Sequence, residues 1–511
     1  MQKMKKAHLI LPLSLFYFTL TGFAQTTDKI VSQIVSEVHG NSQLETLGHE
    51  LLDVIGPRLV GTPQMQQAHD WALAQYSNWG IAAKNEQWGI THIDMVSPRI
   101  QTLKGTQLAW SPSTGRKGIT AELLVLPIVA DSAEFNKWLP SVKGKLVMIS
   151  MKEATGRPDY NWEEFATPES YDKMKKNREL QEDEWSKNLQ RIGYNRRSLP
   201  LALEKAGAAG IVSSYWSKGF GANKIFGANT DKIPFIDLEL EDYTMLYRLV
   251  EHGNRPKIKI LAASKELGAV PTFNTIAEIT GSEKPDEYVI LSAHFDSWDG
   301  GTGATDNGTG TLVMMETMRI LKKLYPNPKR TILVGHWGSE EQGLNGSRAY
   351  VEDHPEIVGK VQAVFNQDNG TGRVVKISGG GFANSYDYIP RWLSVVPVEI
   401  TQHIETTFPG MPAGGGSDNA SFIAAGAPAF GLSSLNWSYW NYTWHTNRDT
   451  YDKIVFDDLR NNVILTAILA YMASEDPEMS SREKRILPVN PRTGEQSLWP
   501  TQRSPERRGG L

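Results

Sequence analysis

The sequence predicts an α/β fold, with a mostly parallel mixed sheet flanked by helices and a smaller β-rich α+β domain inserted into it. Between residues 270 and 475, short apolar runs alternate with helical patterns, which is typical of a sheet covered on both faces. Residues 101–265 contain short strands, Gly-rich turns and one highly charged stretch. Residues 29–83 have the apolar spacing of amphipathic helices.

The elements of the main sheet follow from these patterns in chain order. The predicted strands cover residues 287–297, 330–341, 361–370 and 427–434, and the predicted helices cover residues 308–324, 346–353, 417–426 and 457–473. Because each strand is a nearly continuous apolar run, we expect the strands to be buried on both faces and largely parallel.

The first residues are typical of a signal peptide. Lysines precede an apolar run over residues 9–20, and Gly22 and Ala24 place small residues before a cut after Ala24. The apolar run is too short to span a bilayer as a helix. We therefore expect an exported protein, periplasmic or secreted, with no stable membrane insertion after cleavage near Ala24.

These patterns divide the chain into five expected segments. They are a signal peptide (1–24), the first part of the main domain (25–100), the insert (101–265), the second part of the main domain with its site (266–478), and a polar tail rich in Arg and Pro (479–511). The tail contains few core-forming residues, so we expect part of it to be disordered.

Composition excludes several classes of function. The net charge of -4 and the pI near 6.3 do not support nucleic-acid binding. The chain has no cysteine, which excludes a thiol nucleophile, a disulfide framework and a Cys-based zinc site. A transition metal would have to be held by histidines and carboxylates.

Acidic and imidazole side chains follow three consecutive predicted strands. His294 and Asp296 end the first strand, Glu340 and Glu341 end the second, and Asp368 ends the third. In open α/β sheets, sites gather at the carboxyl ends of the strands. Asp306 lies in the loop after the first strand, and a late loop, "YWNYTWHTNRDTYD", carries His445. The pattern predicts a site that holds divalent metal ions.

The segment "HFDSWDGGTGATDNGTGT" must fold back on itself if His294 and Asp306 are to reach the same site. We expect Gly300, Gly301 and Gly303 to adopt backbone conformations that are closed to other residues.

These motifs together resemble the M28 family of co-catalytic zinc peptidases. The resemblance rests on "AHFDSWDGGTGATDNGTG", "GSEEQGLNGSRAY" and "WHTNRDTYDKI". Within the family, they are most similar to plasma glutamate carboxypeptidase-like dipeptidases and aminopeptidases. The insert resembles a protease-associated domain through "VKGKLVMIS" and "LEKAGAAGIVSS".

The resemblance implies two zinc ions per chain. In this pattern Asp306 bridges the two ions, Glu341 and His445 complete one site, and His294 and Asp368 complete the other. The peptide bond between Asp306 and Asn307 is expected to be cis.

The resemblance also implies how the site acts. Asp296 orients the His294 imidazole, Glu340 is the general base, and the nucleophile is a metal-bridged hydroxide. Further substrate contacts are expected from Ser417, Asp418, Tyr439 and Tyr442. Because Trp444 stands where some relatives have Tyr directly before the late His, the residue that stabilises the oxyanion stays open.

The expected activity is hydrolysis of small peptides with a free amino terminus, either as a dipeptidase or as an aminopeptidase, in a possible homodimer. Two alternatives stay open. One is an inactive peptidase-fold protein that binds a partner, and the other is a single-zinc enzyme similar to glutaminyl cyclases. The complete ligand set in this chain argues against both.

Overall fold

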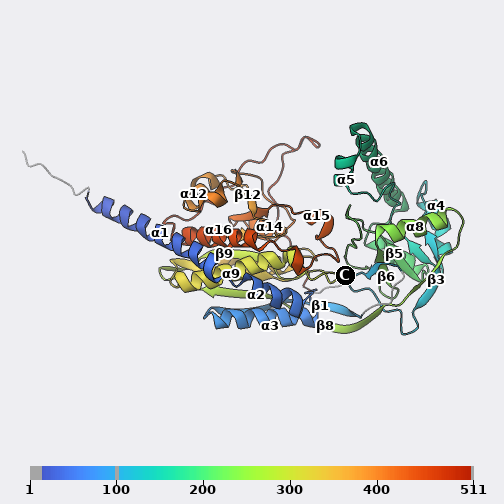
Figure 1. Ribbon diagram of the computed structural model, residues 1–511, viewed down its shortest axis with the longest axis horizontal. Helices are drawn as coiled ribbons and strands as arrows, with labels where there is room; N and C mark the ends of the chain where they lie inside the picture. The colour runs from blue at the N-terminus through green and yellow to red at the C-terminus, as the bar shows by residue number, and fades with distance from the viewer. Residues whose placement is uncertain (1–13, 98–102, 508–511) are drawn as a thin grey trace, which may run out of the picture.

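The computed structural model of the chain describes residues 14–97 and 103–507. It contains one sheet of eight strands and one of six. Figure 1 shows the larger sheet with its helices at the left and the smaller sheet at the right, joined by the long ribbon of strands β1 and β8.

The eight-stranded sheet confirms the predicted fold class. Four adjacent central strands, β10, β9, β11 and β14, run parallel, and β1, β8, β12 and β13 complete a mixed sheet around them. In spatial order, the strands are β1 (Ala82–Ser97), β8 (Ala263–Ile279), β10 (Arg330–Trp337), β9 (Lys284–His294), β11 (Val361–Asn366), β14 (Ala429–Ser434), β12 (Val374–Ser378) and β13 (Glu405–Thr407).

Strand register brings the functional ends of the central strands together. Leu291 of β9 lies opposite Val334 of β10 and Phe365 of β11, and all three are buried. At the carboxyl end, Trp337 lies opposite His294. The residues that follow β9, β10 and β11 therefore emerge at one edge of the sheet.

Helices cover both faces of this sheet. Helices α9 and α16 pack on each other and against β9, whereas α14 packs on β11 and β14. The chain passes from β9 through α9 to β10, and then in the opposite direction from β10 through α10 to β11. Right-handed crossovers in opposite directions place their helices on opposite faces, so α9 and α10 lie on different sides of the sheet. The elements are α1 (Ser14–Asn41), α2 (Leu44–Gly48), η1 (His49–Ile55), α3 (Pro63–Asn78), η3 (Ala304–Gly308), α9 (Thr309–Leu324), α10 (Asn345–Asp353), α11 (Pro355–Val358), α12 (Ser385–Leu393), α13 (Val398–Thr401), α14 (Asn419–Ala424), α15 (Tyr439–Tyr442), η4 (Tyr451–Lys453) and α16 (Phe456–Glu475).

The six-stranded sheet lies between β1 and β8 in the sequence. Its four central strands are parallel and have separate apolar clusters, one around Phe135 and Leu203 and the other around Tyr243. In spatial order, the strands are β2 (Gly105–Gln107), β6 (Phe235–Leu238), β5 (Gly210–Ser213), β4 (Leu146–Met148), β3 (Ile119–Val125) and β7 (Lys257–Ile260).

Helices make up more of this insert than its expected β-rich character implied. The charged stretch of the insert forms α5 and α6, which project from the smaller sheet in Figure 1. The helical elements are α4 (Ser132–Trp138), η2 (Leu139–Val142), α5 (Asp159–Phe165), α6 (Pro168–Ile192), α7 (Ser198–Lys205) and α8 (Leu240–Glu251).

Helix α1 runs through the predicted cleavage point after Ala24. Its amino-terminal end projects from the body in Figure 1, whereas Ile34 and Val38 are fully buried in the main core. A cut after Ala24 would therefore leave the packed part of α1 in the mature chain. None of the helices within residues 14–97 and 103–507 combines the length and apolar character that a bilayer-spanning segment needs.

Residues 479–507, part of which we expected to be disordered, contact the main body of the protein at several points. Trp499 packs edge-on against Phe382 with ring centroids 5.4 Å apart and donates a hydrogen bond to the Ile423 carbonyl. Arg507 pairs with Glu352 and Asp353 of α10. The composition of the tail does not reveal these contacts, because a few anchoring side chains hold an otherwise polar segment.

We predict that Trp499→Ala lowers the stability of the protein by about 1–3 kcal/mol, because it removes both an aromatic contact and a hydrogen bond. The midpoint of thermal unfolding checks this. The matched control is the neighbouring Leu498→Ala, whose side chain is 85% exposed. Equal midpoints for the two variants would contradict the packing of the tail.

Candidate metal centre

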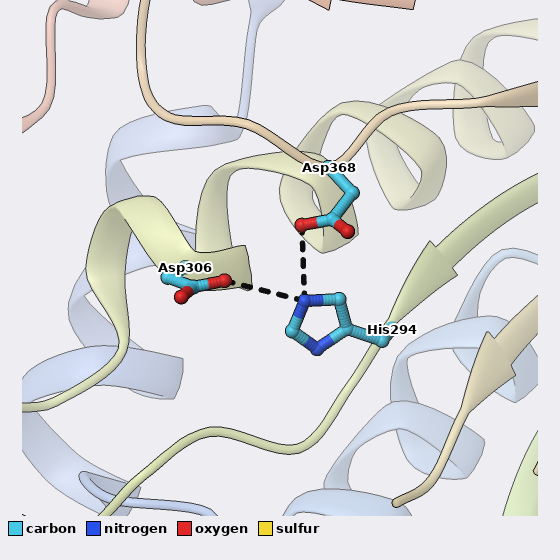
Figure 2. A group of neighbouring side chains, drawn as sticks. All are labelled: His294, Asp306 and Asp368. Carbon is cyan, nitrogen blue, oxygen red and sulfur yellow. Dashed lines mark hydrogen bonds and ion pairs between the residues drawn. The ribbon is translucent and has the colours of Figure 1, made fainter. Parts of the chain in front are cut away.

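One group of possible metal ligands consists of His294, Asp306 and Asp368 (Figure 2). His294 ends β9, Asp306 lies in the turn before α9, and Asp368 follows β11. The Nε2 atom of His294 lies 3.1 Å from Asp368 Oδ1 and 3.4 Å from Asp306 Oδ1. All three side chains are buried, so their polar atoms face one another instead of solvent.

A second group consists of Asp306, Glu341 and His445. The Nε2 atom of His445 lies 2.9 Å from Glu341 Oε2 and 3.4 Å from Asp306 Oδ2. The two carboxylate oxygens of Asp306 therefore face different imidazoles. A carboxylate shared in this way has the geometry expected of a residue that bridges two cations.

Two buried side chains hold the backbone around Asp306. Asp449 accepts hydrogen bonds from the backbone N–H groups of Thr305 and Asp306, at 2.8 and 3.0 Å. Arg58 is fully buried and donates to the carbonyls of four residues, Gly56, Phe295, Thr302 and Gly303.

The predicted cis peptide between Asp306 and Asn307 is confirmed. The prediction for the glycines is confirmed only for Gly303, which has a φ of 63°. Gly300 and Gly301 meet a different constraint, close packing. A Cβ at Gly300 would lie 2.2 Å from Ile225, and one at Gly301 would lie 2.7 Å from the Thr446 and Asp449 carbonyl oxygens.

We expected the Asp296 carboxylate to orient the His294 imidazole, but the structure gives this carboxylate other partners. The backbone carbonyl of Asp296 lies 3.0 Å from His294 Nδ1, whereas its carboxylate oxygen is 3.6 Å away. The carboxylate instead accepts the backbone N–H groups of Glu340 and Glu341, at 3.0 and 3.3 Å. Asp296 therefore positions both glutamates, because the turn after β10 brings their amides to it.

The charges of the group suit bound cations. Burial raises the pKa of Glu340 and of Glu341 well above their usual range, and neighbouring carboxylates add to this effect. Burial alone would lower the pKa of His294, but Asp368 and Glu340 raise it well above normal. Buried atoms Oδ2 of Asp306 and Oε1 of Glu341 have no hydrogen-bond partner within the described chain. Oxygen and imidazole donors of this kind fit a divalent transition metal.

The four expected substrate contacts occupy different places. Tyr439 is buried beside Asp306. Burial is the larger cause that raises the pKa of Tyr439 above its usual range, and the charge of Asp306 raises it further. Tyr439 and Tyr442 both line a cavity of about 590 Å³ next to Thr305. Tyr442 also faces the insert, where its hydroxyl lies 3.5 Å from that of Tyr160.

Ser417 and Asp418 are buried just before α14. Ser417 accepts a hydrogen bond from Asn366, the last residue of β11, at 2.8 Å. Asp418 is fully buried, and burial raises its pKa to about 7. Its carboxylate does not cap α14, although it precedes that helix.

Sequence reasoning missed Arg58, Asp449 and Trp298. Trp298 donates from Nε1 to Glu341 Oε2 at 2.8 Å. Asp449 lies four residues after His445, in the same loop "YWNYTWHTNRDTYD". An acidic residue so near a predicted ligand was the signal that could have identified it. Arg58 lies in "GPRLVGTP" and had no signal beyond an arginine inside a turn.

The peptidase character of this geometry is supported by comparison with known proteins. Residues 274–470 match the description "Peptidase family M28", and this range contains every ligand candidate. The chain is a metallopeptidase with a family M28 domain. It is 27% identical to carboxypeptidase Q of Rattus norvegicus over 91% of this chain and 92% of that protein.

Solved peptidase structures share the fold. A peptidase M28 precursor from Shewanella amazonensis has a TM-score of 0.66 at 24% identity, covering 91% of this chain and 100% of that one. A zinc aminopeptidase from Bacillus subtilis has a TM-score of 0.55 at 19% identity, covering 86% of this chain and 97% of that one.

We predict that Asp449→Asn weakens metal binding about 10- to 100-fold, the range found when a group that orients a ligand is lost. The amide retains an acceptor but places an NH₂ group where two backbone N–H groups converge. Competition with a chromophoric chelator measures the affinity. Asp452→Asn is the matched control, because its side chain is 71% exposed. Unchanged affinity in both variants would refute the positioning role of Asp449.

Proposed function

We propose that this metallopeptidase is a zinc-dependent exopeptidase that hydrolyses small peptides with a free amino terminus. One observation carries the proposal. The two carboxylate oxygens of Asp306 face two different groups of possible ligands, and each group contains an imidazole. In this proposal two zinc ions bind per chain, one through His294 and Asp368, the other through Glu341 and His445, with Asp306 common to both. When bound, zinc lowers the pKa of water and polarises a carbonyl group.

Glu340 is the proposed general base. Its backbone is held by Asp296, and His294 and Asp368 are among the groups whose charges act on its carboxylate. It takes a proton from the attacking water and delivers it to the leaving amine. We propose that Tyr439, whose charge environment includes Asp306, Asp368 and Glu341, donates a hydrogen bond to the oxyanion.

Action at chain ends agrees with the names of the relatives. The rat protein is named a carboxypeptidase and the Bacillus subtilis protein an aminopeptidase. The single bond of a dipeptide is both the first and the last bond of its chain. We further propose export after cleavage near Ala24, on the basis of the signal-peptide pattern in the sequence.

Removal of zinc is expected to abolish hydrolysis reversibly. After dialysis against a chelator, titration with zinc should restore activity, and elemental analysis should find two zinc ions per chain. His294→Ala and His445→Ala should each lose one ion, because each removes a donor from only one group. A stoichiometry of one zinc ion in a wild type that hydrolyses no peptide would favour the cyclase-like alternative.

Glu340→Gln should lower kcat by about 10²–10⁴-fold, the usual contribution of a general base, while zinc content stays at the wild-type value. Steady-state kinetics and elemental analysis of the same preparation check both parts. Glu356→Gln is the control, since its side chain is 66% exposed. A Glu340→Gln enzyme of normal kcat would remove Glu340 from the reaction.

A peptide ladder tests the substrate class. Zinc-loaded protein beginning at Gln25 is incubated with di-, tri- and pentapeptides, with free or blocked ends, and products are followed by mass spectrometry. We expect a blocked amino terminus to prevent cleavage at every length. Absence of any cleavage by folded, zinc-loaded protein would favour the inactive binding protein instead.

A further inference from the structure

Trp298 connects a proposed zinc ligand to the insert. It lies in the turn after β9, between His294 and Asp306, and its side chain is buried. The indole Nε1–H donates to Glu341 Oε2 at 2.8 Å, and the same oxygen lies 2.9 Å from His445 Nε2. The indole therefore holds one oxygen of Glu341 at the place where this carboxylate meets His445.

Two aromatic rings of the insert pack against the Trp298 ring. Trp110 meets it edge-on with ring centroids 5.6 Å apart, and Phe226 meets it edge-on at 6.0 Å. The Phe226 ring also lies edge-on against the His445 imidazole, at 5.1 Å. Trp298 shares a small apolar cluster with Trp110 and Ile225, which is separate from the core of the main sheet. The direction of the indole N–H thus depends on the packing of the insert.

Ile225 of the insert touches both segments that carry this hydrogen-bonded group. Its backbone N–H donates to the His445 carbonyl at 2.8 Å. A Cβ at Gly300, two residues after Trp298, would lie 2.2 Å from the Ile225 side chain. The turn that carries Trp298 and the loop that carries His445 therefore both close against the same residue of the insert.

The other group of possible ligands is held from the main sheet. His294 is the last residue of β9, and its Nδ1 lies 3.0 Å from the Asp296 carbonyl. Asp368 follows β11, where the Gln367 N–H donates to the Ser292 carbonyl of β9 at 3.0 Å. The main sheet thus supports this group directly, whereas the group around the second imidazole also depends on side chains of the insert.

We propose that Trp298 is a positioning residue for the site formed by Glu341 and His445, and that the insert, by packing on its indole, sets the affinity of this site for zinc. This inference rests on the proposed function. A side chain that is already held in its binding orientation loses less conformational freedom when an ion binds. The site formed by His294 and Asp368 is expected to bind its ion independently of Trp298.

Single-site backgrounds separate the two sites. Trp298→Phe is introduced into His294→Ala, which retains the site of Glu341, and into His445→Ala, which retains the site of Asp368. We expect zinc binding to weaken about 10- to 100-fold in the first background, the range for loss of a group that orients a ligand, and to stay unchanged in the second. Competition with a chromophoric chelator at fixed pH measures each affinity. Phenylalanine keeps a ring in the apolar cluster and removes the N–H donor.

A second variant tests the part played by the insert. Trp110→Leu removes a ring that packs on Trp298 but leaves the indole N–H in place. In the His294→Ala background it should weaken zinc binding about 2- to 10-fold, the contribution of one aromatic pair. The matched control is Trp437→Phe, because Trp437 also donates from Nε1 to a carboxylate, that of Asp458, at 2.9 Å. Since Asp458 belongs to neither group of possible ligands, both affinities should stay unchanged.

Selective loss at one site distinguishes positioning from a general loss of structure. Equal weakening of both sites by Trp298→Phe, or weakening of neither, would overturn the proposal. Unchanged affinity in Trp110→Leu would overturn the role of the insert. Thermal unfolding of the metal-free proteins accompanies the titrations, and a selective loss of affinity at an unchanged midpoint supports the proposal.

The titrations need no substrate, so their outcome is independent of hydrolysis. A folded, zinc-loaded protein that cleaves no peptide would reject only the proposed function. A wild type that binds a single zinc ion would reject the two-zinc part of that function. The proposal about Trp298 would then be supported if Trp298→Phe weakens the binding of that ion, and overturned if it does not.

Discussion

The mutual repulsion of buried carboxylates at one sheet edge is the constraint around which this protein is built. Glu340, Glu341, Asp306 and Asp368 converge in a place that water barely reaches, and burial disfavours the charged forms of the two glutamates. Such a cluster is stable only with positive charge inside it. The imidazoles of His294 and His445 provide some, and the cations of the proposed function would provide the rest.

Precise placement of Asp306 is the second requirement, because one carboxylate must serve two groups. Two residues hold the backbone around Asp306. Asp449 comes from the loop that carries His445, and Arg58 comes from the amino-terminal helical region. Arg58 donates only to carbonyl oxygens of the loop and its neighbours, so its role is to fix backbone geometry. The glycines complete this arrangement by admitting Ile225 and two carbonyl oxygens at distances that no side chain would permit.

The insert takes part in the same centre. It leaves and re-enters the main sheet through the paired strands β1 and β8, and it touches the His445 loop through residues 223–225. Backbone hydrogen bonds from the insert thus help to hold the loop that carries His445.

The sequence by itself determined the fold class, the four central strands of the main sheet and the candidate ligands. Apolar runs report burial directly, and the residues that end them must meet where parallel strands end. Tertiary structure decided the rest. The partners of Asp296 and the positions of Arg58, Asp449 and the tail depend on contacts between segments far apart in the chain. Periodicity carries no information about such contacts, because a single hydrogen bond or ring contact leaves no repeating pattern in the sequence.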